Sequence, residues 1–521
     1  MPKTSVFLLK NSILVGTMTM LSRMLGLLRD VVFAHTIGAQ AGADAFFVAF
    51  KIPNFLRRLF AEGAFAQAFV PVLAEYRQRG SLAAIHGLID RVCGCLGMIL
   101  LLLTLFVVVS APIMTVIFAP GFWSDPVRFQ LTESMLRLTF PYLFLIAMTG
   151  MAGAILNSYD RFAVPAFTPV LLNISLITTA IWLAPYIEPP VVALAWGVLI
   201  GGIVQLSFQI PFLWRLRLVP KPIIDWGHPG VKKILLLMGP AIFAVSVSQI
   251  NLLLDTVLAS LLPQGSVSWL YYSDRLTELP LGVFAIAIAT VILPNLSRQH
   301  IDTNANLFSA TLDWALRLIL LVAIPAAVAL VILAQPILIT LFQYGRTTAF
   351  DVGMSALSLQ AYSLGLVAFM LIKVLAPGYF ARHDMKTPAK IGIIAMIVNI
   401  VFNIILVIPF HFFWQIGHVG LALATALSAF VNAGLLFLGL LKMGIYKPQN
   451  NWLFYLAKLF LANSVLAITL WLSLDYFQQW QTATAWQRVS QLLGICIVGL
   501  GVYLSVLLLS GLRARHFRIS V

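Results

Sequence analysis

The chain has 521 residues, of which 61% are hydrophobic and 10% are charged, and its mean hydropathy is +0.97. Soluble domains carry about 25% charged residues, so this composition excludes a soluble globular protein and predicts a polytopic membrane protein. The formal net charge of +15 does not predict a nucleic-acid partner, because most lysines and arginines lie in short loops between apolar runs, where they orient a membrane protein.

Apolar runs follow one another along the whole sequence, and a bilayer-crossing helix needs about 20 such residues. Breaking the chain at turn residues and loop charges predicts fourteen helices and an all-α fold class. The predicted helices span residues 11–35, 42–75, 88–118, 131–157, 163–184, 190–214, 232–262, 267–296, 306–342, 352–380, 388–410, 416–441, 452–475 and 487–511.

Positive charge segregates between alternate loops, which predicts that both termini face the cytoplasm. One set of loops is almost free of it, with only Arg128, Arg346 and Arg488. The other set, on the side of the termini, holds Arg77, Arg79, Arg161, Arg215, Arg217, Lys221, Lys232, Lys233, Arg298, Arg382, Lys386, Lys390, Lys442 and Lys447.

The two halves of the sequence resemble each other weakly but in order. LLRDVVFA at 27–34 matches LLLDTVLA at 252–259 in five of eight positions, at an offset of 225. Further on, Pro71 and Pro294 lie at an offset of 223 within a second match. An even number of helices per repeat predicts two parallel lobes related by an axis along the membrane normal. We expect six-helix lobes at residues 1–218 and 219–449, around a central cavity, and an extra helix pair at 450–521.

Charged residues inside three predicted helices are the main functional signal. An arginine at the middle of a span costs roughly 2.5–3.5 kcal/mol, so these residues must face water or each other. An alternative is purely structural, through snorkelling or internal ion pairs such as Arg317 with Asp313. The candidate binding residues are Arg23, Arg29, Asp44, Arg57, Arg58, Glu62, Asp274, Arg275 and Glu278.

The four arginines Arg23, Arg29, Arg57 and Arg275 predict a cationic pocket for an anion that bears phosphate, because guanidinium offers paired donors to phosphate oxygens. Asp274 and Glu278 are one turn apart and are expected to hold Arg275 in place. Pro53 is expected to break its helix near Ile52 and expose backbone groups. The sequence has no Walker motif, metal-ligand cluster or nucleophile triad, so an enzyme is not expected.

Long blocks of the sequence closely resemble the MurJ (MviN) family of bacterial lipid II flippases, in the multidrug/oligosaccharidyl-lipid/polysaccharide exporter superfamily. The blocks are GTMTMLSRMLGLLRD at 16–30, DAFFVAFKIPNFLRRLFAEGAFAQAFVP at 44–71, SVSWLYYSDRLTELPLGVF at 266–284 and KVLAPGYFARHDMKTPAK at 373–390.

This resemblance implies transport of lipid II, the undecaprenyl-pyrophosphate-linked peptidoglycan precursor, across the inner membrane by alternating access. Membrane lipids and cell-wall synthases are the other expected partners. The resemblance also implies that the last two helices form a groove for the lipid tail. It makes Arg23, Arg29, Arg57 and Arg275 the essential residues of the cavity, with Asp44 as an important acid.

The energy source has two interpretations. Asp255, Asn399, Asn403 and Thr425 are similar to the positions of a sodium site in some family members. The amides instead suit ordinary hydrogen bonds between helices. The membrane potential acting on a cationic cavity is the rival source, at ~2.3 kcal/mol per charge per 100 mV.

Three other functions compete with this one. An exporter of another lipid-linked oligosaccharide also handles pyrophosphate. A membrane-embedded transferase needs an acidic cluster near a cytoplasmic loop, and Asp160, Asp225 and Asp384 are isolated in the sequence. A scaffold of the cell-wall machinery is a third possibility.

Overall fold

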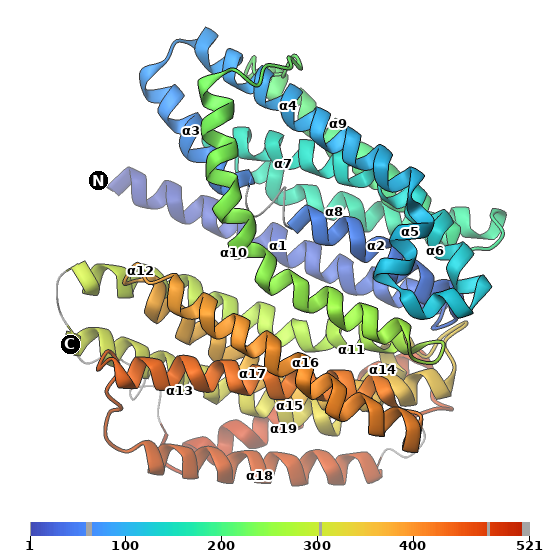
Figure 1. Cartoon of the computed structure of the whole chain (residues 1–521). Helices are drawn as coiled ribbons and strands as arrows, with labels where there is room; N and C mark the ends of the chain where they lie inside the picture. The colour runs from blue at the N-terminus through green and yellow to red at the C-terminus, as the bar shows by residue number, and fades with distance from the viewer. Residues whose placement is uncertain (1, 59–64, 302–304, 477–479, 513–521) are drawn as a thin grey trace. The chain divides into compact units, whose positions relative to one another are not determined.

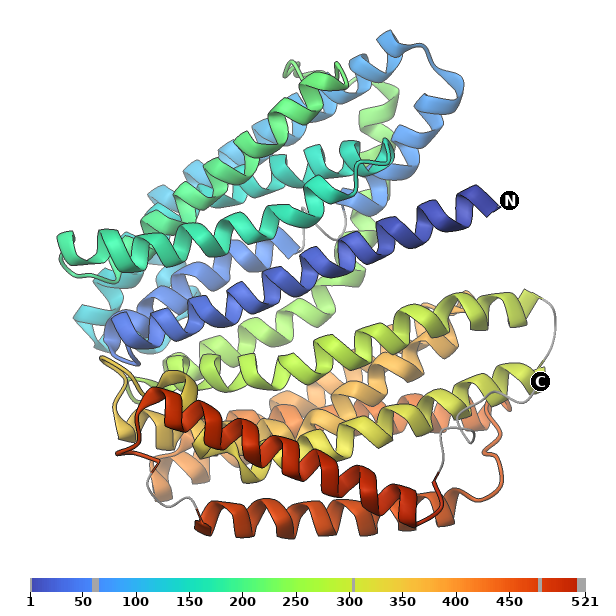
Figure 2. The ribbon, with the colours of Figure 1, turned by 180° about the vertical axis from the view of Figure 1, so that it is seen from behind.

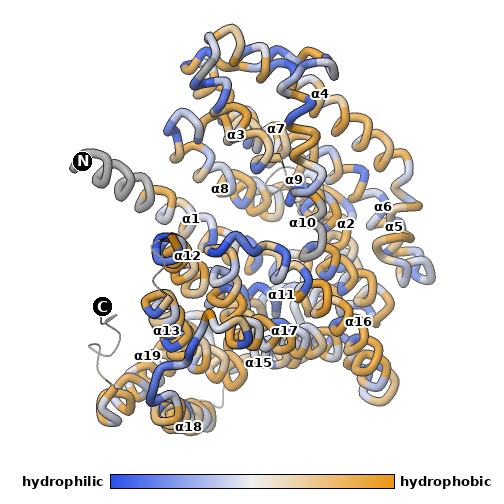
Figure 3. The backbone as a smooth tube through the Cα atoms, turned by 60° about the vertical axis from the view of Figure 1, so that its left-hand side comes forward, coloured by the Kyte–Doolittle hydropathy of each residue, from blue (hydrophilic) through white to orange (hydrophobic). Residues whose placement is uncertain are grey.

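The computed structural model describes residues 2–58, 65–301, 305–476 and 480–512, and every regular element among them is a helix (Figures 1 and 2). Eleven helical stretches of these residues are long and apolar enough to cross a membrane. Apolar residues cover most of α4 (Leu82–Val109) and α16 (Lys386–Trp414) in Figure 3. The all-α, multi-pass class predicted from the sequence is therefore confirmed.

The chain divides into two compact units, residues 1–268 and 269–521. The first contains α1 (Pro2–Thr36), α2 (Ala41–Arg57), α3 (Phe65–Arg79), α4, α5 (Ala111–Phe118), α6 (Pro126–Thr139), α7 (Tyr142–Ser158), α8 (Ala163–Thr178), α9 (Val192–Arg215) and α10 (Pro229–Ser260). α11 (Ser266–Pro280) begins at the boundary. The second contains α12 (Ile286–Ile301), α13 (Ala305–Ile332), α14 (Ala334–Phe342), α15 (Ala349–Phe380), α16, α17 (Gly417–Lys442), α18 (Trp452–Tyr476) and α19 (Ala485–Leu509).

The helix bounds repeat along the chain with the offset seen in the sequence. α4 and α13 begin at residues 82 and 305 and end at residues 109 and 332, an offset of 223 at both ends. α6 and α15 begin at residues 126 and 349, and α8 and α16 at 163 and 386, again 223 apart. The same order of helices is thus built twice.

The expected break at Ile52 is wrong, because α2 continues through Pro53 to Arg57. Proline lacks the N–H that would bond the carbonyl of Ala49, one turn earlier. The hydroxyl of Thr139 on α6 donates to that carbonyl instead, at 3.0 Å. A neighbouring threonine therefore satisfies the freed backbone group, which is how proline is tolerated inside membrane helices.

Several predicted helices are divided. The predicted helix 88–118 is broken at Ser110 into α4 and α5, and 306–342 is broken at Leu333 into α13 and α14. The predicted helix 267–296 contains a π-helical turn, Leu281–Ala285, directly after Pro280. Wide turns of this kind interrupt the regular hydrogen-bond ladder of a helix and concentrate at functional sites.

The C-terminal helix pair is tied to the second unit by a buried acid. Asp313 on α13 is 1% exposed. One of its oxygens accepts hydrogen bonds from Tyr446 and Trp452, each at 2.7 Å, and the other pairs with Arg317 at 2.8 Å. Apolar side chains give helices little reason to associate in lipid, so such polar contacts hold α18 against α13.

At the other end of the helix pair, Arg488 on α19 is buried and reaches the end of α14. Its guanidinium donates to the carbonyl oxygens of Ile339 and Gln343, both at 3.3 Å. A cation at the C-terminus of a helix satisfies its last carbonyls and its dipole. Arg488 is one of the three arginines on the loops otherwise free of positive charge, and its role here is structural.

Replacing Asp313 with alanine is expected to lower the free energy of unfolding by about 3–5 kcal/mol, because Arg317 loses its partner in a buried position. Chemical denaturation in mixed micelles measures this change. The control is Glu133→Ala, which breaks the exposed pair between Glu133 and Arg137 on α6 and is expected to cost about 0–1 kcal/mol. A loss at Asp313 as small as the control would contradict this interpretation.

Candidate functional site

Arg29 is the most firmly held of the predicted binding residues. It is 5% exposed, and its guanidinium makes two hydrogen bonds to one oxygen of Asp30, at 2.7 and 3.0 Å. It also donates to the side-chain oxygen of Asn173 on α8 at 3.1 Å, while the amide nitrogen of Asn173 donates to the carbonyl of Ser22 at 3.0 Å. Arg29 therefore joins α1 to α8, and its charge is balanced by Asp30.

Arg23, Arg57 and Arg58 are less enclosed. All three are half-buried; Arg23 lies on α1, Arg57 ends α2, and Arg58 follows it directly. The Nε of Arg57 donates to the side-chain oxygen of Asn54, one turn earlier, at 2.8 Å. Glu62 lies outside the described residues. These three guanidinium groups keep part of their surface accessible, which is what contact with a solute requires.

Asp44 is fully enclosed, and its oxygens accept hydrogen bonds from the start of α11. One oxygen accepts the backbone N–H of Gly265 at 2.7 Å; the other accepts the backbone N–H and the hydroxyl of Ser268, at 2.9 and 2.6 Å. The first N–H groups of a helix have no partner within it. Asp44 thus caps α11 from another helix and is not available to a solute in this structure.

Arg128 lies beside this carboxylate and completes the cluster. It is 8% exposed, its Nη1 is 4.0 Å from Asp44, and it donates to the carbonyl of Leu262 at 3.5 Å. Its Nε donates to Asp125, the N-cap of α6, at 2.7 Å. Burial opposes ionisation of Asp125, but hydrogen bonds from the backbone and guanidinium of Arg128 outweigh it and lower the pKa of that carboxyl.

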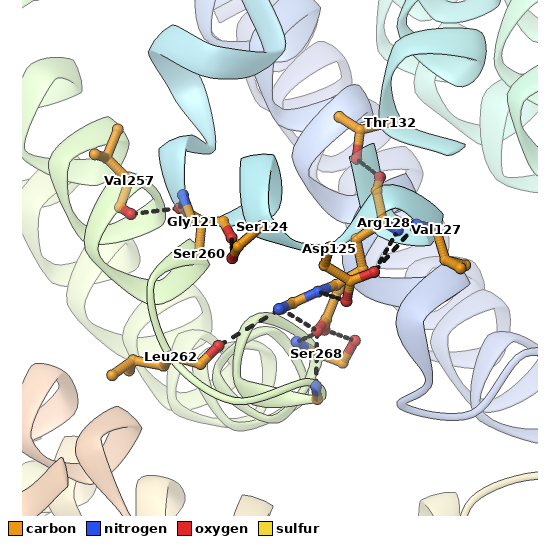
Figure 4. A network of polar contacts seen from close by, with 12 residues as sticks. Gly121, Ser124, Asp125, Val127, Arg128, Thr132, Val257, Ser260, Leu262 and Ser268 are labelled. Atoms are coloured by element: carbon orange, nitrogen blue, oxygen red, sulfur yellow. Dashed lines mark hydrogen bonds and ion pairs between the residues drawn. The ribbon is translucent and has the colours of Figure 1, made fainter. Parts of the chain in front are cut away.

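The loop before α6 packs closely on the end of α10. The N–H of Gly121 donates to the hydroxyl of Ser260 at 3.2 Å (Figure 4). A side chain at Gly121 would place its Cβ 2.1 Å from the carbonyl oxygen of Ser260, so only glycine fits. Together with the Asp44 cluster, this contact fixes both ends of the loop that joins α10 to α11.

Of the two acids predicted to hold Arg275, Glu278 pairs with it. The Nη1 of Arg275 lies 2.9 Å from Glu278, three residues later on α11. The guanidinium carbon also lies 5.6 Å from the centre of the Tyr271 ring, which is a cation–π contact. Arg275 is half-buried, and Asp274 is exposed on the same helix. Arg275 is therefore oriented but still accessible.

The residues of the predicted sodium site fall in two groups. Asn399 and Asn403 on α16 are buried, and the amide of Asn403 donates to the oxygen of Asn399 at 3.0 Å. Asn399 in turn donates to the hydroxyl of Thr425 on α17 at 3.4 Å, so interhelical hydrogen bonds, the alternative interpretation, are present. Asp255 lies on α10 in the first unit.

A family model described as "Lipid II flippase MurJ" matches residues 33–490. A probable lipid II flippase MurJ of Vibrio cholerae is 48% identical over 518 residues, covering 98% of both chains. Lipid II flippase MurJ of Burkholderia cenocepacia is 42% identical, covering 97% of this chain and 98% of its own.

The chain belongs to the MurJ family. A solved lipid II flippase MurJ in an inward closed conformation is 28% identical, with a TM-score of 0.78, covering 95% of this chain and 98% of its own. An inward-facing transporter of the multidrug-resistance MATE family shares the fold with a TM-score of 0.63 at 17% identity, covering 83% of this chain and 98% of its own.

Sequence reasoning missed Asn173, Ser268 and the place of Arg128. Two of them left a signal: Asn173 is an amide within an apolar run, and Arg128 is one of three arginines on the loops otherwise free of positive charge. Polar residues within a membrane span are costly and are kept for a purpose. Neither signal named the partner, because Arg29 lies 144 residues from Asn173 and Leu262 lies 134 residues from Arg128 along the chain.

Replacing Asp44 with asparagine is expected to destabilise the protein by about 1.5–3 kcal/mol, because hydrogen bonds to a charged acceptor are lost. In a double-mutant cycle with Ser268→Ala, we expect a coupling energy within about 0.5–3 kcal/mol. Thermal and chemical unfolding of the four variants in detergent measure both values. Additive effects of the two substitutions would show that Asp44 does not cap α11.

Proposed function

We propose that this chain moves lipid II from the cytoplasmic to the periplasmic leaflet of the bacterial inner membrane. Its relatives are named lipid II flippases. The observation that carries the proposal is the set of half-buried arginines, Arg23, Arg57 and Arg275, on α1, α2 and α11. Guanidinium groups match the oxygens of a pyrophosphate, and their cost in a membrane is offset when they face a water-filled cavity.

The proposed mechanism follows from the chemistry of the substrate. A pyrophosphate with a sugar-peptide headgroup does not cross hydrocarbon at a useful rate, whereas its isoprenoid tail remains in lipid throughout. The protein must therefore enclose the headgroup, stay open to the bilayer for the tail, and alternate its access between leaflets. Nothing in this process makes or breaks a covalent bond, so the chain acts as a transporter.

In this proposal fourteen helices cross the membrane, with both termini in the cytoplasm. Residues 1–218 and 219–449 form two parallel six-helix lobes around a cationic cavity, and residues 450–521 hold the lipid tail. Arg23, Arg57 and Arg275 bind the pyrophosphate, together with Arg58, Glu62, Asp274 and Glu278 at the cavity wall. Arg29 and Asp44 support this site by fixing α1 and the start of α11. The π-helical turn after Pro280 is the bending point of the second lobe.

Alanine at Arg23, Arg57 or Arg275 is expected to abolish growth of a cell depleted of its own lipid II flippase, while the wild-type chain restores it. The physical reason is the loss of a paired donor to phosphate. Colony counts, with membrane levels of each variant, measure the outcome. The control is Arg137→Ala, at an exposed pair on α6, which is expected to grow normally.

Two failures of this experiment have separate meanings. If a wild-type chain that accumulates in the membrane does not restore growth, the substrate is another lipid-linked oligosaccharide. If every arginine variant grows, the arginines are structural and the cationic cavity is refuted.

Either a sodium ion or the membrane potential is proposed as the energy source. A test of sodium binding distinguishes between the two. Asp255, Asn399, Asn403 and Thr425 offer the carboxylate, amide and hydroxyl oxygens that a small hard cation prefers. If sodium binds there, sodium chloride raises the midpoint of thermal unfolding above that in choline chloride at equal ionic strength. Asp255→Asn and Asn399→Ala are expected to remove this rise. An equal midpoint in both salts would leave the membrane potential as the source.

A further inference from the structure

An apolar cavity of about 250 Å³ lies in the first unit, and its lining residues include no charged side chain. Its walls come from α3, α4 and α10. Hydrocarbon side chains line most of it, together with Cys95 and Gly239. An apolar cavity of about 150 Å³ stays free of water and takes up benzene, so this larger one suits part of a hydrocarbon chain and not water.

The floor of the cavity is buried, but its rim is exposed. On the floor, Leu100 is 1% exposed and Val231 is 3% exposed; on the rim, Ile99 and Leu235 are each 40% exposed. Both rim residues lie on apolar helices, next to exposed side chains such as Leu101 and Leu236. The cavity therefore opens on a surface that faces hydrocarbon in a membrane, and an occupant can enter from the bilayer.

A cation lies on α10 one turn before Leu235, which lines the cavity. Lys232, in the first turn of α10, is exposed and forms no ion pair with any residue that the structure describes. It lies three and seven residues before Leu235 and Gly239, so all three share one face of the helix. The start of a helix also favours an anion, because its first N–H groups point outward.

The neighbouring cations are already balanced. Lys233 pairs with Glu75 at 2.5 Å, and Arg91 pairs with Asp225 at 2.8 Å. The hydrogen bond from Arg91 lowers the pKa of Asp225 below its usual value, so this carboxyl is ionised at neutral pH and cancels the guanidinium charge. Of these three cations, Lys232 is the one without an ion pair among the described residues, so it remains for a ligand.

We propose that this cavity is a binding site for an anionic glycerophospholipid, distinct from the headgroup site. One acyl chain occupies the apolar cavity, and the phosphate lies against Lys232 at the start of α10. The order of the parts matches such a lipid, with the cation at the loop end of α10 and the hydrocarbon walls deeper along the helix. The proposal does not depend on the transported substrate.

Native mass spectrometry of the full chain with added phosphatidylglycerol or phosphatidylcholine tests the site. The wild type is expected to retain one phosphatidylglycerol more strongly than phosphatidylcholine. Gly239→Phe fills the cavity, since a Cβ at Gly239 meets open space, and is expected to weaken retention about tenfold by displacing acyl methylenes. Ile99→Trp fills it from the opposite wall. Lys232→Gln is expected to weaken phosphatidylglycerol binding about fivefold and to leave phosphatidylcholine unchanged.

Matched control variants distinguish the effect of filling the cavity from a general loss of stability. Gly392→Phe places the same side chain in open space on α16, and Leu101→Trp places tryptophan at an exposed position of α4 outside the cavity. Both are expected to bind phosphatidylglycerol as the wild type does. Undiminished binding in both filled variants, or equal retention of the two lipids by the wild type, would overturn the proposal. Displacement of phosphatidylglycerol by undecaprenyl phosphate would assign the cavity to the isoprenoid tail instead.

Discussion

The structure depends on one constraint: inside a membrane, a polar group must find its partner within the protein. Water is not available there, and apolar side chains attract one another no more than they attract lipid. Asp44, Arg29 and Asp313 are each enclosed, and each accepts or donates bonds to another helix. Even the backbone obeys the rule, because Thr139 bonds the carbonyl that Pro53 leaves without a partner. Polar side chains therefore decide which helices meet.

The two repeats meet this constraint with different residues at corresponding places. The third residue of α6 is Arg128, beside Asp44; the third residue of α15 is Asp351, whose carboxylate accepts the indole N–H of Trp269 at 3.0 Å. Arg128 and Asp351 are 223 residues apart, the offset of the repeat. The two helices begin at corresponding residues of the repeats, but the side chain at their third position is an arginine in α6 and an aspartate in α15. The carboxylate beside Arg128, that of Asp44 on α2, caps α11 by accepting from Gly265 and Ser268.

The arginines fall into two groups with different physical roles. Arg29, Arg128 and Arg488 are buried and bonded in fixed positions, so their charges hold helices and loops together. Arg23, Arg57 and Arg275 remain half-buried. An ordered but accessible guanidinium loses little conformational freedom when it binds phosphate, because its planar fork is already organised for two hydrogen bonds. Buried arginines that hold the helices in place, together with accessible arginines that bind phosphate, suit a site that must release its ligand as well as bind it.

The sequence alone determined the membrane class, most helix bounds, the repeat offset and the residues that carry charge into the apolar runs. These features are local: hydropathy, proline and loop charge act over a few neighbouring residues. Sequence also paired Arg275 with Glu278 and Arg317 with Asp313, because both pairs lie within one turn of a helix. Only the tertiary structure decided that Asp44 caps α11, that α2 passes Pro53 unbroken, and that Asn173 holds Arg29. Each of these depends on a partner from a distant helix, and the spacing of residues along a chain does not specify which distant helix will lie beside it.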